Sequence, residues 1–264
     1  MRAIRLWCGV LLLLWAGIGG AFAAPDDDAF DKLLAKYVQA SPDGLNRVDY
    51  AGWKANAADR AALGAYIKGV EKTQISKLPR PAQFAAWANL YNAVTLKVIL
   101  DNYPVASIRD IKSTFTLDPA ALGGGPWWSK LVTVEGKQLT LNNIEHDILR
   151  KQFRDPRVHY AVNCASFGCP NLQRKAWRAA TLEADLDQAA RAYVNHARGA
   201  TIREGGLQVS SIYSWFKVDF GNTDEGVIQH LKKYARPELA EKLAGVSKIS
   251  GDDYSWVLNE TRSK

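Results

Sequence analysis

Two cysteines, Cys164 and Cys169, are the residues of this sequence best suited to covalent chemistry. Cys164 directly follows a predicted strand, residues 157–163, and opens the loop 165–170. A thiol at such a corner is accessible to substrate, and nearby backbone N–H groups lower its pKa and can hold an oxyanion. In an oxidising compartment, however, two cysteines this close also favour a disulfide. The pair therefore indicates either a nucleophile or a local covalent clip.

A cysteine nucleophile needs a base, which is normally a histidine oriented by a second polar group. His159 precedes Cys164 by five residues on the predicted strand, and at this odd separation the two side chains face opposite sides. His146 lies in the first turn of a predicted helix, and nothing prevents its approach to the thiol. His196 and His230 are expected on polar helix surfaces. The sequence thus favours His146 as the base.

Two further interpretations apply to these residues. Glu145 stands three residues after Asn142, which is the spacing of a capping box and explains the carboxylate without a functional role. A zinc site built from His159, Cys164 and Cys169 lacks a fourth ligand and the usual ligand spacing. We therefore expect no metal and no cofactor.

Elements of both types must position these residues. Apolar residues at helical spacing predict helices over residues 26–39, 57–70, 81–100, 142–152, 181–197 and 222–234, the last with an Asn222/Glu225 capping box. Hairpins are expected at 131–141 and 201–209, a short strand and turn at 46–53, and a strand at 254–258. Strict βαβ alternation is absent, so we predict a single α+β domain with an antiparallel sheet packed against helices.

Asn89 and Asn92 lie on one face of the otherwise apolar helix 81–100. Buried amides need hydrogen-bond partners. These two side chains are therefore expected either to brace a neighbouring loop or to point into a cavity.

The first 23 residues have the pattern of a secretory signal peptide. Arg2 and Arg5 precede an apolar stretch, and Ala21-Phe22-Ala23 provides a cleavage site. We expect a periplasmic or secreted protein with no transmembrane anchor after cleavage. Loss of the two arginines lowers the net charge by two, from +7 to +5. Without a run of Lys or Arg this charge excludes nucleic acid, although it allows loose attraction to anionic envelope polymers.

Five segments together resemble the family called domain of unknown function 547: FAAWANLYNA (84–93), IEHDILR (144–150), CASFGCP (164–170), SWFKVDF (214–220) and YSWVLN (254–259). Ala88 departs from the larger aliphatic residue typical of the family. The resemblance places the domain at residues 80–264, after an N-terminal helical segment at 24–79. It implies an α+β fold distantly similar to papain-like or transglutaminase-like enzymes.

The same resemblance implies a set of site residues. Cys164 falls at the motif cysteine and His146 at the motif histidine, whereas Trp87, Asn89, Asn92 and Asp219 fall at motif positions without assigned roles, and Ser166 lies inside the cysteine motif. In a papain-like geometry, Asn89 or Asp219 would orient the histidine.

Two functions follow as hypotheses. The first is an exported cysteine-dependent hydrolase or acyltransferase acting on an amide, in a peptide, a peptidoglycan stem or a γ-glutamyl compound. The second is a non-catalytic periplasmic module that binds a peptide or small thiol, or that senses redox state. Its cleft would be lined by aromatic residues, for which Trp87, Trp127, Trp128 and Trp215 are candidates.

Overall fold

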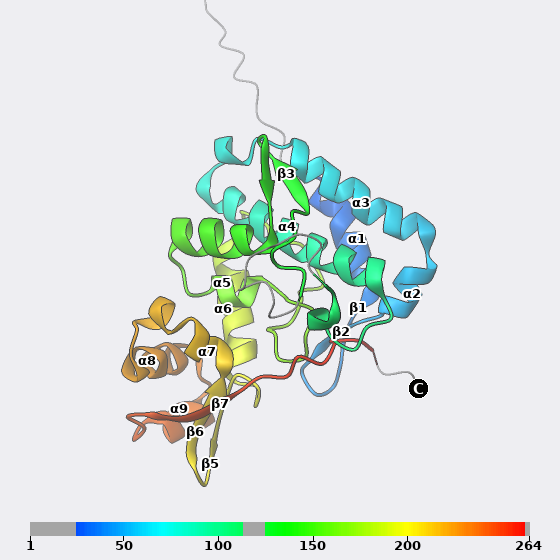
Figure 1. The fold of residues 1–264 in the computed structure, drawn as a ribbon. Coiled ribbons are helices and arrows are strands. Elements are labelled where there is room, and N and C mark those ends of the chain that lie inside the picture. Colours follow the sequence, from blue (N-terminus) through cyan, green and yellow to red (C-terminus); the bar gives the residue numbers. More distant parts are fainter. Residues whose placement is uncertain (1–24, 113–124, 262–264) are drawn as a thin grey trace, which may run out of the picture.

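A computed structural model describes residues 25–112 and 125–261. The predicted signal peptide at 1–23 lies outside the described residues. Within them, the predicted α+β class is confirmed: helices dominate, and the strands form three small separate sheets (Figure 1).

The N-terminal part is helical and covers the longest helix, α4 (Arg80–Asn102). It consists of α1 (Asp27–Tyr37), α2 (Tyr50–Ala55), α3 (Ala57–Lys72) and the short η1 (Ile75–Lys77). Stacked rings join these helices, with Phe30 on Tyr66 and Tyr37 on Trp53, each pair 4.6 Å between centroids. Nearly every residue of α4 from 84 to 100 is buried, so this helix is the centre of the hydrophobic core.

Each sheet is small, and two of the three are made of two strands that follow one another in the sequence. Strands β1 (Val38–Ala40) and β2 (Asn46–Val48) pair antiparallel, as do β3 (Val132–Val134) and β4 (Lys137–Leu139). In the third sheet, β5 (Ala200–Arg203) pairs antiparallel with β6 (Gly206–Ser210). Strand β7 (Ile249–Asp253) then joins β6 in parallel, so this sheet is mixed rather than purely antiparallel.

The remaining helices follow α4 along the chain, and those within residues 211–243 lie beside the third sheet (Figure 1). They are η2 (Ile108–Asp110), the π-helical η4 (Asn143–Phe153), α5 (Val158–Ala161), α6 (Leu182–Val194), α7 (Ser211–Trp215), η5 (Lys217–Phe220), α8 (Asp224–Tyr234) and α9 (Pro237–Leu243). No helix in the described part of the chain is both long and apolar enough to cross a membrane.

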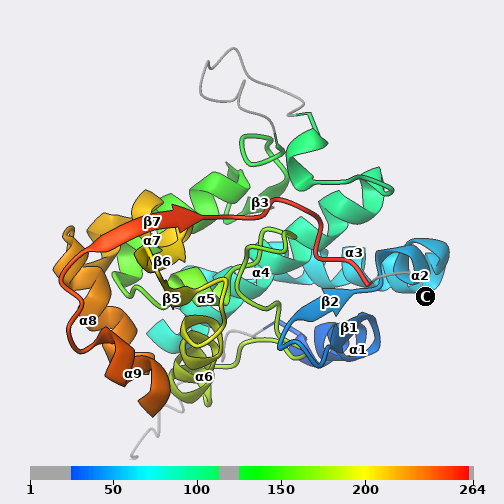
Figure 2. The same ribbon diagram turned by 90° about the horizontal axis from the view of Figure 1, so that it is seen from below.

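After β7 the chain crosses the molecule to reach β2 (Figure 2). The strand predicted at residues 254–258 is wrong, because the strand lies earlier, at Ile249–Asp253. The crossing segment instead makes single bridges, between Leu258 and Ser166 and between Glu260 and Val48. It therefore connects the cysteine loop with the N-terminal helical part.

Candidate functional site

A cavity of about 230 Å³ collects most of the chemically capable side chains. Its walls come from α4, η4, α5, the cysteine loop, α7 and the crossing segment. The lining residues that matter here are Cys164, Cys169, Glu145, His146 and His159, with the aromatic residues Tyr91, Trp127, Trp215, Phe216, Tyr254 and Trp256. The fold thus brings together residues that the sequence separates by more than one hundred positions.

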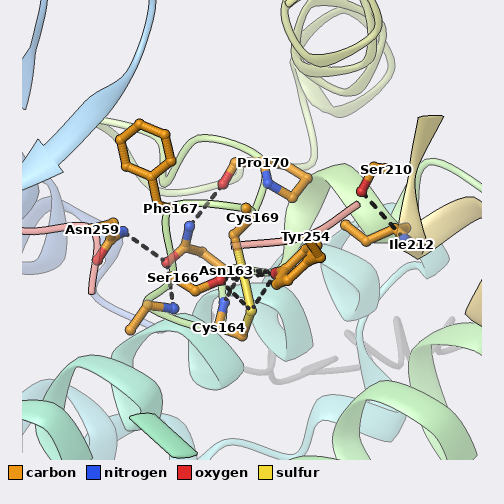
Figure 3. Close-up of a disulfide and its surroundings, with 12 residues drawn as sticks. Asn163, Cys164, Ser166, Phe167, Cys169, Pro170, Ser210, Ile212, Tyr254 and Asn259 are labelled. Carbon is orange, nitrogen blue, oxygen red and sulfur yellow. Dashed lines mark hydrogen bonds between the residues drawn. A yellow bond between two sulfur atoms is a disulfide. The ribbon is translucent and has the colours of Figure 1, made fainter. Parts of the chain in front are cut away.

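Cys164 and Cys169 lie at disulfide-bonding distance, with their Cα atoms 6.3 Å apart. Cys169 is buried, whereas Cys164 is partly exposed toward the cavity. The Tyr254 hydroxyl lies 3.0 Å from each sulfur atom (Figure 3). Ser166 donates a hydrogen bond of 2.9 Å to that hydroxyl, which leaves the Tyr254 proton directed to the sulfurs. Tyr254 is therefore placed to stabilise a thiolate when the pair is reduced.

Amide side chains hold the cysteine loop in place. Asn92 on α4 accepts a hydrogen bond from the Asn163 N–H and donates one to the Ala161 carbonyl. Asn163 in turn spans the loop, accepting from the Ala165 N–H and donating to the Pro170 carbonyl (Figure 3). Of the two roles expected for the helix amides, Asn92 has the bracing one.

Asn89 also braces a loop, but one outside the cavity. Its side chain bonds both the N–H and the carbonyl of Trp177 and donates to Asp27. It does not contact a histidine, so it does not orient one. Trp87 is buried and lines a different cavity, beside Gln83 and Asp147.

The strand predicted at 157–163 is wrong, because residues 158–161 form the short helix α5. The argument that placed His159 opposite Cys164 therefore fails, and both residues line the same cavity. His159 is 3% exposed and stacks on Phe216 at 4.4 Å. Its Nε2 lies 2.7 Å from Asp219 Oδ2, which forms a histidine–carboxylate pair at the site.

Asp219 is also bonded by Arg150, whose Nε donates to the same oxygen at 2.6 Å. Burial raises the pKa of Asp219, but the hydrogen bonds from His159 and Arg150 outweigh it and hold the pKa at about 2. The carboxylate is thus ionised at neutral pH, so His159 carries its proton on Nε2. In the described part of the chain its Nδ1 has no hydrogen-bond partner.

His146 is held through its other ring nitrogen, Nδ1. Arg150 Nη1 lies 3.2 Å from His146 Nδ1, and because a guanidinium can only donate, Nδ1 must accept. His146 is then neutral with its proton on Nε2. Burial lowers the pKa of His146, with Arg150 acting in the same direction and Glu145 opposing it.

Glu145 does not belong to a capping box with Asn142. The reciprocal bonds are made two residues earlier, where Thr140 and Asn143 bond each other's backbone N–H groups. The Asn142 side chain makes no capping bond. The Glu145 carboxylate is therefore not used in the helix end, is buried, and lines the cavity.

The second predicted capping box, Asn222/Glu225, is also wrong. Thr223 caps α8 by accepting from the Gly226 N–H, and Glu225 instead bonds Gln229.

The other two histidines are half-buried rather than exposed on polar helix surfaces. His230 bonds the Tyr160 hydroxyl at 2.8 Å, and burial lowers its pKa to about 4. His196 contacts the Asp43 carbonyl. Both lie outside the cavity walls.

Most backbone amides of the cysteine loop already have acceptors. The N–H groups of Phe167 and Gly168 bond the crossing segment, and that of Ala165 bonds Asn163. The Cys164 N–H points to the Cys169 sulfur at 2.9 Å. Of these four groups, only the Cys164 N–H would become available to an oxyanion once the cysteines separate.

Sequence reasoning missed Arg150 and Tyr254 as members of the site. Arg150 stands four residues after His146 on the same helix, a spacing that could have indicated contact. Tyr254 belongs to a segment expected as a regular strand, and only the crossing path brings it to the sulfurs. In the described residues no group of three or more His, Cys, Asp or Glu side chains is placed to hold a metal ion.

Comparison with known proteins gives a family but no activity. Residues 75–194 match the family described as "Protein of unknown function, DUF547". This range contains Glu145, His146, His159 and both cysteines, whereas Asp219 and Tyr254 lie beyond it. No curated protein and no solved structure matches the chain. Over residues 75–194, the chain is therefore similar to the DUF547 family.

Proposed function

We propose that this protein is an exported cysteine-dependent amide hydrolase or acyltransferase that is active when the Cys164–Cys169 pair is reduced. The observation that carries the proposal is the His159–Asp219 pair, 2.7 Å apart, on the wall of the cavity that Cys164 also lines. A carboxylate that fixes one ring nitrogen of a histidine and leaves the other free is the arrangement that activates a nucleophile.

The chemistry begins with reduction of the disulfide by an external dithiol, which is itself oxidised to a disulfide. Cys164, the more exposed of the two, is then the attacking thiol, and Tyr254 donates to its sulfur. The thiolate adds to the substrate carbonyl, the amine leaves with a proton, and an acyl–Cys164 thioester forms. Water or a second amine then takes the acyl group and restores the thiol.

His159 suits the role of base better than His146. Among the described residues the Nδ1 of His159 has no hydrogen-bond partner, whereas the Nδ1 of His146 is occupied by Arg150 and its Nε2 carries a proton. His146 is instead equipped to donate a hydrogen bond from Nε2 toward the oxyanion or the leaving group. The preference for His146 depended partly on the family resemblance and partly on the strand predicted for residues 157–163, of which Val158–Ala161 is helical.

A ligand-binding or redox-sensing module on the same scaffold is the second candidate, favoured by the disulfide itself. With the sulfurs joined, neither Cys164 nor Cys169 can act as a nucleophile, and the aromatic wall of the cavity can still bind a peptide or small thiol. In this case reduction would change ligand affinity without turnover.

Alkylation of the reduced protein separates the two candidates. We expect iodoacetamide to modify Cys164 with an apparent pKa at least about one unit below the ordinary value of about 8.5. His159→Ala should return the value toward that of an ordinary thiol, and Asp219→Asn should do so in part. His196→Ala, outside the cavity, is the matched control. An ordinary thiol pKa in the wild type would reject the enzyme and leave the binding module.

Export is part of the proposal and is tested separately. We expect the protein recovered from the periplasm to begin at residue 24, as measured by intact mass. A mass that retains residues 1–23 would contradict cleavage of the signal peptide.

A further inference from the structure

Glu145 is a buried carboxylate without a fixed counter-ion. It is 8% exposed and lines the cavity. Its nearest basic atom is the His146 Nδ1, at 4.0 Å, and the Tyr91 hydroxyl is its neutral neighbour. In the described part of the chain, no Lys or Arg nitrogen lies within ion-pairing distance of this carboxylate.

The charged groups around Glu145 do not neutralise its carboxylate. Arg150 is the guanidinium of the site, and it pairs with Asp219 through its Nε. His146 accepts a hydrogen bond from the same guanidinium and is neutral. Among the described residues, the Glu145 carboxylate therefore has no Lys or Arg paired with it. Because an unpaired buried charge is unfavourable, a cation in the cavity would be stabilised.

The aromatic residues that line the cavity also favour a cation. Trp127, Trp215, Tyr254 and Trp256 form a continuous cluster in which neighbouring ring centroids lie 4.8 to 5.7 Å apart. Aromatic faces attract cations through their quadrupole.

Two rings of the cavity already hold protein cations: Arg109 lies over Trp256 at 5.4 Å, and Arg150 lies over Phe216 at 4.6 Å. Within the described residues, Trp127, Trp215 and Tyr254 have no such partner.

We propose that this cavity binds a ligand bearing an organic ammonium group, which pairs with Glu145 while its apolar body packs on Trp127, Trp215 and Tyr254. The inference rests on the proposed function only for its catalytic meaning: the ammonium would belong to the substrate or to the amine that accepts the acyl group. The binding itself requires no thiol. A cavity of about 230 Å³ accommodates a ring or a short chain next to the charged group.

The test compares two probes of matched shape on the oxidised protein. Benzylammonium and benzyl alcohol differ in the charged group, and their dissociation constants are measured by calorimetry or ligand-observed NMR at pH 7. We expect benzylammonium to bind about tenfold more tightly, since a charge-assisted hydrogen bond is stronger than a neutral one. Equal affinity, tighter binding of the alcohol, or no binding of benzylammonium at 10 mM (about the limit of such measurements) would overturn the proposal.

Variants then test whether Glu145 causes the preference for benzylammonium over benzyl alcohol. Glu145→Gln keeps the shape and should reduce the preference to within about twofold. Asp147→Asn, a half-exposed carboxylate on the same helix, is the control and should keep it. Trp215→Ala, at a side chain that is 49% exposed, should weaken both probes without unfolding the protein. Retention of the preference in Glu145→Gln would overturn the assignment.

The two proposals fail independently. Probe binding is measured with the disulfide intact, whereas the enzyme proposal is tested on the reduced thiols. A cavity that prefers benzylammonium beside an unreactive Cys164 would support the ammonium site and reject the enzyme.

Discussion

Asp219 joins two of the basic side chains of the site, His159 and Arg150, through one oxygen atom. Its Oδ2 accepts from both His159 and Arg150, and its pKa is held at about 2 although burial raises it. A carboxyl group whose pKa is lower in the folded state than in the unfolded chain stabilises the fold above the unfolded pKa, about 3.9 for Asp. That contribution is lost as the pH falls through the folded value.

We therefore expect Asp219→Asn to lower the free energy of unfolding by about 1–3 kcal/mol at pH 6. The difference from wild type should shrink between pH 4 and pH 2, because the wild-type carboxyl becomes protonated there. Urea unfolding at pH 6, 4 and 2.5 measures this. Asp110→Asn, at an exposed position in η2, is the control. A difference that stays constant with pH would show that Asp219 contributes only shape.

At the scale of secondary-structure elements, the sequence predicts the long helices well and the short ones poorly. The helices predicted at 57–70, 81–100 and 181–197 correspond to α3, α4 and α6, because each has a clear apolar stripe. Residues 158–163 are all buried, so alternation along that segment carries no information on which face is internal. The capping box lies two residues before the predicted one, because Thr140 and Asn143 make the reciprocal bonds, with an amide in place of the glutamate.

The residues of the candidate site also divide into those that the sequence predicts and those that only the structure brings together. Both cysteines and His146 could be chosen from the sequence, since residue type and local spacing suffice to propose them. The partner of His159 lies 60 residues away, so its pairing with Asp219 depends on how η5 packs against α5. The sequence explains Glu145 as part of a capping box, and only the structure shows that Thr140 and Asn143 make those capping bonds and leave Glu145 to the cavity.

Helix α4 supports the site through Asn92, and this support should be measurable. Asn92→Ala leaves the buried Asn163 N–H without its partner, whereas the Ala161 carbonyl still accepts from the Trp177 indole N–H, so the expected cost is about 1–3 kcal/mol. Asn102→Ala, exposed in the last turn of the same helix, should cost less than about 1 kcal/mol. Denaturant unfolding compares the two variants. Equal losses would mean that the bonds of Asn92 to the cysteine loop add nothing.

At the scale of the whole molecule, the crossing segment after β7 links three parts of the fold. Its backbone bonds Phe167 and Gly168 of the cysteine loop and Val48 of β2. The Asn259 side chain accepts from Tyr50 and donates to Asn163. The site residue Tyr254 lies at the start of this segment. The position of the sulfurs and the integrity of the N-terminal helical part are thus connected through residues 254–260.

Two adjacent residues of this segment allow that connection to be tested. Leu258 is 3% exposed, whereas the side chain of Val257 is 64% exposed. Leu258→Ala should lower the free energy of unfolding by about 2–4 kcal/mol by leaving a cavity, and Val257→Ala should change it by less than about 0.5 kcal/mol. Because the segment covers the cysteine loop, Leu258→Ala should also speed reduction of the Cys164–Cys169 pair by dithiothreitol under native conditions, through more frequent local opening. Thiol titration over time measures this rate. If both variants are reduced at the wild-type rate although Leu258→Ala is destabilised, the cysteine loop opens independently of the crossing segment. The crossing segment would then stabilise the fold without controlling access to the sulfurs.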